Sequence, residues 1–158
     1  PVVDIHNAQL SEVDALFISE AASEEDLKYR VPFTGVTGLF FRHALYQAGV
    51  NDSSVVLTNT VVCRPTEESG INRIPTLTEL ENCSDRIKVF VETLKPKAVC
   101  LVGAVARDFY GKKLLEWKYM GQVWLIHHPA YILRLGGDTS QAYQDWVDSI
   151  RDVLSSTR

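Results

Sequence analysis

The sequence predicts an α/β fold of three layers, in which helices cover both faces of a central four-stranded parallel sheet. Three observations lead to this prediction: four short apolar runs of strand length, amphipathic segments between them, and a chain of 158 residues, which is enough for one domain with a real core. Strands that alternate with helices are typical of parallel sheets, because each crossover helix packs against the sheet. We therefore expect residues 1–158 to form a single domain.

The four expected strands are short apolar runs, each bounded by polar or turn-forming residues. Runs that are apolar on both sides are typical of parallel strands, since helices cover both faces of such a sheet. In chain order the strands occupy residues 15–18, 55–57, 98–102 and 123–126. The second strand ends near Asn59, and the third is followed by Gly103.

The segments between the strands carry apolar residues at helical spacing, together with helix start and stop signals. Gly49 ends the first helix and Pro96 ends the second, which Thr76 or Thr78 can cap at its start. Residues 64–75, rich in Pro, Glu, Ser and Gly, are expected to form an exposed loop. The expected helices span residues 38–48 and 76–94, a short segment that ends at residue 109, and residues 140–154.

The composition is that of an ordinary globular protein. The chain is 46% hydrophobic and 23% charged, with a mean hydropathy of −0.04, and this balance argues against disorder. No apolar run approaches the length that crosses a bilayer, and no basic-then-apolar start suggests a secretion signal. Three cysteines at irregular spacing argue against a disulfide framework, so we expect a reducing intracellular compartment.

Charge is unevenly distributed along the chain. The net charge of −4 excludes a uniformly basic nucleic-acid-binding protein, but not a local basic face. Residues 1–30 hold seven acidic and two basic residues, whereas residues 84–134 hold nine basic and four acidic residues. Either these are solvated faces that differ by chance, or the basic segment forms a face that meets an anionic polymer.

Polar side chains gather where the expected strands end. Ligands of an open parallel sheet bind beyond the carboxyl ends of its strands, where this chain has Glu20, Asn59 and His128, with Phe33 in the loop after the first strand. An amide can pair with an imide edge, a phenyl ring can stack on a base, and an imidazole can donate to a developing oxyanion. Singly, each residue is better explained as a turn former, a packed side chain or a solvated acid. Together they favour a pocket for a planar, hydrogen-bonding ring.

Five ordered motifs resemble those of family 4 uracil-DNA glycosylases. The first motif has two parts, Ser-Glu-Ala-Ala-Ser at residues 19–23 and Pro-Phe-Thr-Gly at residues 32–35, which are similar to that family's Gly-Glu-Ala-Pro-Gly and Pro-Phe-x-Gly. The likeness covers about residues 13–148. The other motifs are Leu-Thr-Asn-Thr-Val-Val-Cys-Arg-Pro at residues 57–65, Asn-Arg-Ile-Pro-Thr at 72–76, Lys-Pro-Lys-Ala-Val at 95–99, and His-Pro-Ala-Tyr-Ile-Leu-Arg at 128–134.

The resemblance implies a monofunctional glycosylase that flips uracil out of DNA and hydrolyses its N-glycosidic bond during base excision repair. Phe33 would stack on the base, and Asn59 would pair with its O4 and N3 edge. His128 would stabilise the departing uracil anion, and Glu20 would hold the attacking water or face the cationic sugar. Glu25 and Asp26 remain alternatives to Glu20 as the residue that positions the water. Backbone N–H groups near Ala21 and Ala22 would contact the base.

The resemblance also implies a DNA interface. Leu135 and Arg134 would wedge into the duplex beside the extruded base, and Arg73 would contact DNA. The basic excess of residues 84–134 would then meet phosphates. The expected partners are uracil-containing DNA and, beyond it, replication or repair proteins, with no membrane. The expected protein is a monomer in the cytoplasm of a prokaryotic or phage-like source.

The first motif departs from the family pattern. Two glycines and a proline are replaced in residues 19–23, and Arg30 stands where the family usually has a glycine before its Pro-Phe pair. Because glycine permits backbone conformations that Ala and Ser restrict, the pocket is expected to be narrower or rearranged. Two alternatives to uracil excision therefore stay open: a catalytically weakened module that docks on DNA or replication proteins, and a glycosylase for another deaminated or modified base.

The cysteines bear on a cofactor. Family 4 glycosylases hold a [4Fe–4S] cluster with four cysteines, and Cys63 and Cys83 match two of them. The resemblance implies that the Cys-x-x-Cys pair that completes the site lies upstream of Pro1, unless this relative has lost the cluster. Two thiolates alone are too few for a four-ligand cluster. Cys100, inside an expected strand, is interpreted as a core residue.

Overall fold

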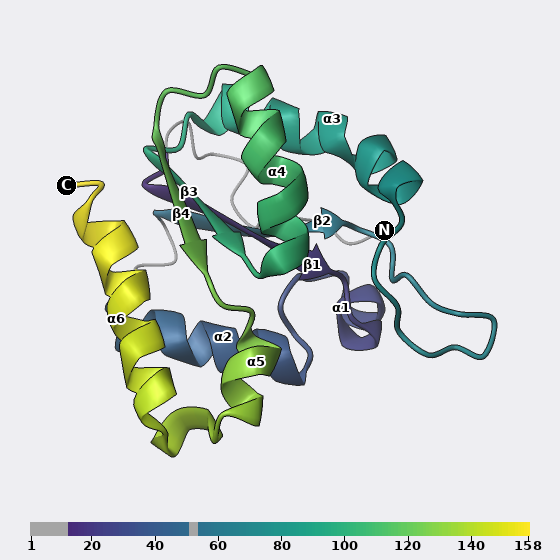
Figure 1. Ribbon diagram of the computed structural model, residues 1–158, viewed down its shortest axis with the longest axis horizontal. Coiled ribbons are helices and arrows are strands. Elements are labelled where there is room, and N and C mark those ends of the chain that lie inside the picture. The colour runs from purple at the N-terminus through teal and green to yellow at the C-terminus, as the bar shows by residue number, and fades with distance from the viewer. Residues whose placement is uncertain (1–12, 51–53) are drawn as a thin grey trace.

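The computed structural model describes residues 13–50 and 54–158, and their centre is a sheet of four parallel strands (Figure 1). The strands lie in the order β2-β1-β3-β4, so the first strand of the chain is internal and the last forms an edge. The predicted four-stranded parallel sheet is therefore confirmed. The strand bounds are Ala15–Ala21 for β1, Val55–Val61 for β2, Ala98–Val102 for β3 and Gln122–Ile126 for β4.

Helices cover both faces of this sheet, which makes the three layers that the sequence predicts (Figure 1). One face packs against α2 (Val36–Gln47) and α6 (Gln141–Ser155), with the short α5 (Pro129–Arg134) beside them. The other face packs against α3 (Leu77–Leu94) and α4 (Ala104–Glu116). The core under α2 and α6 is built around Phe17, Phe41 and Trp146, and the core under α3 and α4 around Ile18, Ile87 and Tyr110.

The strands β1 and β2 are longer than the apolar runs that predict them. β1 continues to Ala21 and β2 to Val61, so Glu20 and Asn59 lie inside strands rather than beyond them. In β2 the polar residues Thr58 and Asn59 are buried. Arg86 of α3 donates to the Thr58 hydroxyl over 2.9 Å and to the Asn59 carbonyl over 2.6 Å. Polar groups that have hydrogen-bond partners can be buried in a strand. A prediction from hydrophobicity alone therefore places the end of β2 too early.

Two short helices were not expected from the sequence. They are α1 (Glu24–Tyr29) and α5, each of six residues, too short to show a helical period. In addition, α4 extends to Glu116, seven residues past the expected end at residue 109. The helices α1, α4 and α5 each follow the carboxyl end of a strand. Residues of α4 and α5 line the candidate site.

Residues 64–75 form the exposed loop that the sequence predicts, and the loop is held at its base. A single bridge pairs Thr66 with Asn72 in antiparallel orientation. The Arg64 side chain donates to the Asn72 side-chain oxygen over 2.7 Å. Within the two stretches of chain that the structure describes, no helix has the length and apolar character needed to cross a membrane.

Candidate active site

A cleft of about 820 Å³ crosses the carboxyl end of the sheet. Its wall includes Leu101 from the core under α3 and α4, and Ile132 and Trp146 from the core under α2 and α6. Glu20 and His128 line it as well. The structure thus brings the two predicted catalytic side chains to one cavity, as expected where parallel strands end.

His128 begins α5, and its ring accepts a hydrogen bond from the same helix. The N–H of Ala130 donates to Nδ1 of His128 over 3.1 Å. An Nδ1 that accepts a hydrogen bond carries no proton, so the neutral ring carries its proton on Nε2. Burial, followed by the positive charge of Arg134, lowers the pKa of His128 below its ordinary value of 6.5. At neutral pH the ring is therefore a neutral donor through Nε2.

Gly103, between β3 and α4, leaves room for that ring. Its φ of 88° lies in the left-handed region that glycine tolerates. A Cβ at this position would lie 2.9 Å from the Cβ of His128 and 3.4 Å from its Cδ2. The Gly103 N–H also donates to the Ile126 carbonyl over 2.9 Å, which ties the turn to the end of β4. The position of His128 therefore depends on the absence of a side chain at Gly103.

Glu20 presents a half-buried carboxyl group to the cleft. Burial raises the pKa of Glu20 above its ordinary value of 4.5, because weakly polar surroundings disfavour the charged form. Its main-chain carbonyl accepts a hydrogen bond from the Thr60 hydroxyl on the neighbouring strand. Within the chain that the structure describes, Glu25 and Asp26 do not line the cleft. Of the three acids considered for the water, Glu20 is the one in place.

Asp26 instead joins two segments of the site. It is 3% exposed, and its carboxylate accepts hydrogen bonds from the Ser23 N–H at 3.2 Å and from the Thr34 N–H and hydroxyl, both at 2.8 Å. Burial raises the pKa of Asp26, but the hydrogen bonds from Thr34 and Ser23 outweigh it, and the pKa is lowered from 3.8. The charged carboxylate fixes the end of the first motif against the Pro-Phe-Thr-Gly loop.

Phe33 occupies a constrained backbone conformation in that loop. Its φ of 62° is in the left-handed region, which is costly for a residue with a side chain. Arg42 donates to the Phe33 carbonyl over 2.9 Å and to the Pro32 carbonyl over 2.7 Å. A Cβ on Gly38 would lie 2.4 Å from the Phe33 Cα, so α2 approaches this loop only because Gly38 lacks a side chain. Contacts from α2 therefore hold Phe33 in place.

Phe33 and Asn59 lie beside the cleft rather than in its wall. Asn59 is 4% exposed and pairs in register with Ser19, next to Glu20. The Phe33 ring lies 5.4 Å from the Phe41 ring, which lies 5.6 Å from the Trp146 indole in the cleft wall. Neither Phe33 nor Asn59 lines the cleft in the part of the chain that the structure describes. Two packed rings, Phe41 and Trp146, thus lead from Phe33 to the cleft wall, and Asn59 is buried in β2.

The altered first motif is compatible with an unstrained backbone. Among the described residues, no position from 19 to 23 has a positive φ. Ser23, which replaces a glycine of the family pattern, has a φ of −85° and caps α1 by accepting from the Asp26 N–H at 3.1 Å. Strain falls instead on Arg30, whose φ is 56° at the end of α1. Arg30 is also the position where the family pattern has a glycine.

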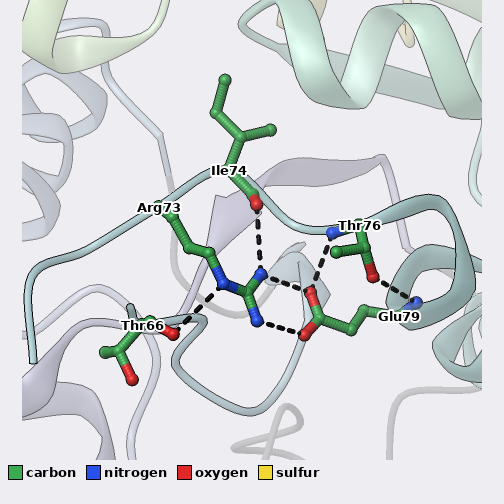
Figure 2. A network of polar contacts seen from close by, with 5 residues as sticks. All are labelled: Thr66, Arg73, Ile74, Thr76 and Glu79. Atoms are coloured by element: carbon green, nitrogen blue, oxygen red, sulfur yellow. Dashed lines mark hydrogen bonds and ion pairs between the residues drawn. The ribbon is translucent and has the colours of Figure 1, made fainter. Parts of the chain in front are cut away.

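Arg73 is held by the chain itself (Figure 2). Its guanidinium donates to both carboxylate oxygens of Glu79, at 2.9 and 2.7 Å, and to the carbonyls of Thr66 and Ile74. Glu79 also accepts from the Thr76 N–H at the start of α3 over 2.8 Å. Hydrogen bonds from Arg73, and then from Thr76, lower the pKa of Glu79 to about 2. This network ties the 64–75 loop to α3, and it uses most of the donors that a DNA phosphate would need.

The other predicted contact residues are divided between the surface and the interior. Arg134 and Leu135 line the cleft and are exposed at the end of α5. Ala22 is 4% exposed, whereas Ala21 is partly exposed as the last residue of β1. The structure therefore brings Arg134 and Leu135, but not Arg73, to the cavity that holds Glu20 and His128.

Cys63 and Cys83 do not complete a metal site. Cys63 is exposed, Cys83 is partly buried, Cys100 is buried in the core, and all three are free thiols. Over the residues that the structure describes, no group of three or more His, Cys, Asp or Glu side chains could hold a metal ion. A four-thiolate cluster would need two ligands that the printed sequence does not contain.

Sequence reasoning missed the supporting residues of the site, which are Gly38, Arg42 and Gly103. Their roles depend on contacts between segments far apart in the chain, and a single sequence carries no local signal of them. Asp26 is different, because Ser23 and Asp26 form a capping box at the start of α1. Ser-x-x-acid spacing predicts a helix start, and that signal would have identified both the helix and the role of the aspartate.

Comparisons with known proteins agree with these observations. A model of the uracil DNA glycosylase superfamily matches residues 7–151. The chain is 32% identical over 130 residues to a type-4 uracil-DNA glycosylase of Thermotoga maritima, covering 75% of this chain and 66% of that protein. It is 30% identical over 138 residues to the type-4 uracil-DNA glycosylase of Archaeoglobus fulgidus, covering 76% and 67% respectively. It therefore spans about two thirds of the length of these relatives.

Proposed function

The chain belongs to the uracil-DNA glycosylase superfamily, and from this membership we propose that it removes uracil from DNA by hydrolysing the N-glycosidic bond. The observation that carries the proposal is the neutral His128, a donor through Nε2, in the same cleft as Glu20. The reaction would be the first step of base excision repair. The base would have to leave the stack to reach a cleft at the end of the sheet.

His128 would stabilise the leaving group. Cleavage of the bond leaves negative charge on the uracil ring, and a donor already aimed at a carbonyl oxygen lowers the free energy of that state. The Ala130 N–H fixes the other ring nitrogen as an acceptor, so the donor does not need to reorient during the reaction. A neutral ring keeps its proton and holds the anion by a hydrogen bond.

Glu20 would act on the sugar side. A carboxylate can accept a proton from the attacking water and can face the positive charge that develops on the sugar. The raised pKa of Glu20 brings the carboxyl group closer to the working pH, where a general base is most effective. Its place on β1, paired with β2 and β3, holds it on a rigid element.

Phe33 and Asn59 would select the base. We propose that the flipped uracil stacks on Phe33 and pairs its O4 and N3 edge with Asn59, which carries a donor and an acceptor in one plane. Backbone N–H groups near Ala21 and Ala22 would contact the same ring. The hydrogen bonds from Arg42 to the Phe33 carbonyl and from the Thr34 N–H to Asp26 support this role, because they fix the loop that carries the ring.

The proposal is tested by a uracil-excision assay with single- and double-stranded oligonucleotides. We expect alkali-labile abasic sites with the wild type, and at least a hundredfold loss in kcat for His128→Ala and Asn59→Ala. His43→Ala is the matched control, because His43 lies on α2 and does not line the cleft. Absence of excision by the wild type from both kinds of DNA would overturn the proposal.

The excision assay, combined with a measurement of DNA affinity, distinguishes the enzyme from a binding module. A weakened module would bind uracil-containing DNA without turnover, and Glu20→Gln would not change its affinity. The unstrained backbone of residues 19–23 favours the enzyme over the module. Excision of another deaminated base in place of uracil would instead assign the chain to that base.

We also propose that Cys63 and Cys83 supply two of the four ligands of a [4Fe–4S] cluster. Their exposed and partly exposed thiols support this, since buried Cys100 cannot reach a surface ligand. Iron analysis and visible absorbance of protein purified with and without air test the proposal. Iron-free protein under both conditions would overturn it.

The three free thiols also support a reducing intracellular compartment. We further propose that the protein is a monomer and that it binds other repair or replication proteins.

A further inference from the structure

Three flat side chains form an exposed stack on the wall of the cleft, next to His128. The His127 and Tyr131 rings lie 4.8 Å apart between centroids at an interplanar angle of 40°. The Arg134 guanidinium carbon lies 5.9 Å from the centre of the Tyr131 ring. His127, Tyr131 and Arg134 all line the cleft, and Tyr131 is 39% exposed. We call these three residues the His127 stack.

The His127 stack is built on fixed backbone. The Trp146 indole N–H donates to the His127 carbonyl over 3.0 Å. The Tyr131 N–H donates to the His128 carbonyl over 3.0 Å, and the Tyr131 carbonyl accepts from the Leu135 N–H over 3.2 Å. A platform that is already ordered loses little conformational entropy when a ligand stacks on it.

The chemistry of the stack fits a nucleobase. Every base has a flat apolar face, and aromatic rings and guanidinium planes are the surfaces on which proteins stack unpaired bases. Arg134 adds a positive charge for the phosphate next to such a base. The stack is distinct from Phe33 and Asn59, which lie beside the cleft rather than in its wall.

We propose that the His127 stack binds an unpaired base that flanks the uracil in single-stranded DNA. The inference rests on the proposed function, because the uracil must sit near His128 for its neighbour to reach Tyr131. In a duplex the flanking base is paired and stacked within the helix, so it does not reach the platform. The stack therefore favours single-stranded substrates by raising their affinity.

The test is a binding measurement that needs no turnover. A single-stranded oligonucleotide carries a stable abasic analogue in place of the deoxyuridine and the fluorescent base aminopurine beside it. We expect quenching of the aminopurine by the wild type, and about tenfold weaker binding with less quenching for Tyr131→Ala. Tyr131→Phe keeps the ring and should bind like the wild type. Tyr46→Ala is the matched control, because Tyr46 is 77% exposed on α2 and does not line the cleft.

Kinetics provide the second readout. With single-stranded uracil DNA, Tyr131→Ala should raise KM about tenfold and leave kcat within about twofold, because the stack acts on binding. Unchanged binding and KM for Tyr131→Ala would overturn the inference, and so would equal losses with single- and double-stranded DNA. If the wild type quenches the aminopurine but does not excise uracil, the proposed function is overturned and the inference that the His127 stack binds a base is kept.

Discussion

At the residue scale, the protonation of His128 sets a limit on the working pH. The folded pKa lies below 6.5 because burial and Arg134 disfavour the charged ring. Protonation would also displace the Ala130 N–H from Nδ1. Since an unfolded chain binds this proton more readily, the contribution of the neutral ring to stability is present above pH 6.5 and is lost as pH falls through the folded pKa.

We therefore expect the acidic limb of kcat/KM to have an apparent pKa below 6.5, and NMR titration of the His128 ring to give a value below 6.5 as well. Glu20 can also contribute to the rate profile, because its pKa is raised above 4.5. The NMR titration separates the two groups. A ring that titrates above 6.5 would contradict the neutral-donor assignment.

Glu20 has the opposite effect on stability. Its folded pKa is raised above the ordinary 4.5 by burial, so stability is lost as pH rises through the folded pKa. Glu20→Gln should abolish excision and raise Tm at pH 7 by about 1–3 °C. The gain should disappear below pH 4.5, where the carboxyl group is protonated in both states. Thermal melts of Glu20→Gln and of the exposed control Glu25→Gln test this, and a lower Tm at pH 7 would contradict it.

At the element scale, the end of α1 carries avoidable strain. Arg30 has a φ of 56°, a conformation that costs a residue with a side chain about 1 kcal/mol. Arg30→Gly should raise the free energy of unfolding by about 0.5–1 kcal/mol, once the larger entropy of an unfolded glycine is subtracted. Urea denaturation measures the change, with unchanged excision activity as the control. A destabilised variant would show that the Arg30 side chain contributes more than its backbone strain removes.

The turn from β3 to α4 is a second element on which the site depends. Gly103→Ala combines a positive φ with a Cβ that lies 2.9 Å from the His128 Cβ. Gly49→Ala is a matched control, because Gly49 has a φ of 83° and no described residue lies within 4 Å of the added Cβ. We expect both variants to lose about 1 kcal/mol of stability, and Gly103→Ala alone to lose kcat by more than tenfold. Equal kcat values for Gly103→Ala and Gly49→Ala would show that the position of His128 does not depend on Gly103.

The sequence was a good guide to elements with a strong hydrophobic pattern. All four strands and the helices α2, α3 and α6 lie where apolar runs or helical periods predict them, whereas α4 continues seven residues past its predicted end. The ends of β1 and β2 were placed too early, because buried Thr58 and Asn59 depend on Arg86, which is distant in sequence. Short helices have no measurable period, and so α1 and α5 were not predicted.

The structure brings predicted site residues to one cavity where topology alone determines position, and their roles remain predictions. Glu20 and His128 line one cleft because the ends of parallel strands share one edge of the sheet. The assignment of Arg73 to DNA remains a prediction, and the structure offers Glu79 as the partner of this guanidinium. A basic residue in a loop looks the same in sequence whether it meets a phosphate or a carboxylate.

At the scale of the whole molecule, charge would govern the proposed encounter with DNA. Although the net charge is −4, the cleft rim carries Arg107 and Arg134. We expect DNA affinity to fall steeply with salt, and Arg134→Ala to reduce the slope for single-stranded DNA by about 0.7. Arg151→Ala, on α6 and outside the cleft lining, should leave the slope unchanged. Equal slopes for all three proteins would show that Arg134 does not contact a phosphate.

The left-handed backbone of Phe33 also bears on how this chain can change over generations. Any side chain at Gly38 collides with the Phe33 backbone, and Asp26 and Arg42 hold that backbone from other directions. These four positions are Asp26, Phe33, Gly38 and Arg42. A substitution at one of them would shift the loop, and the other three residues would then no longer fit it. We therefore expect these four residues to change together in a lineage that alters the loop.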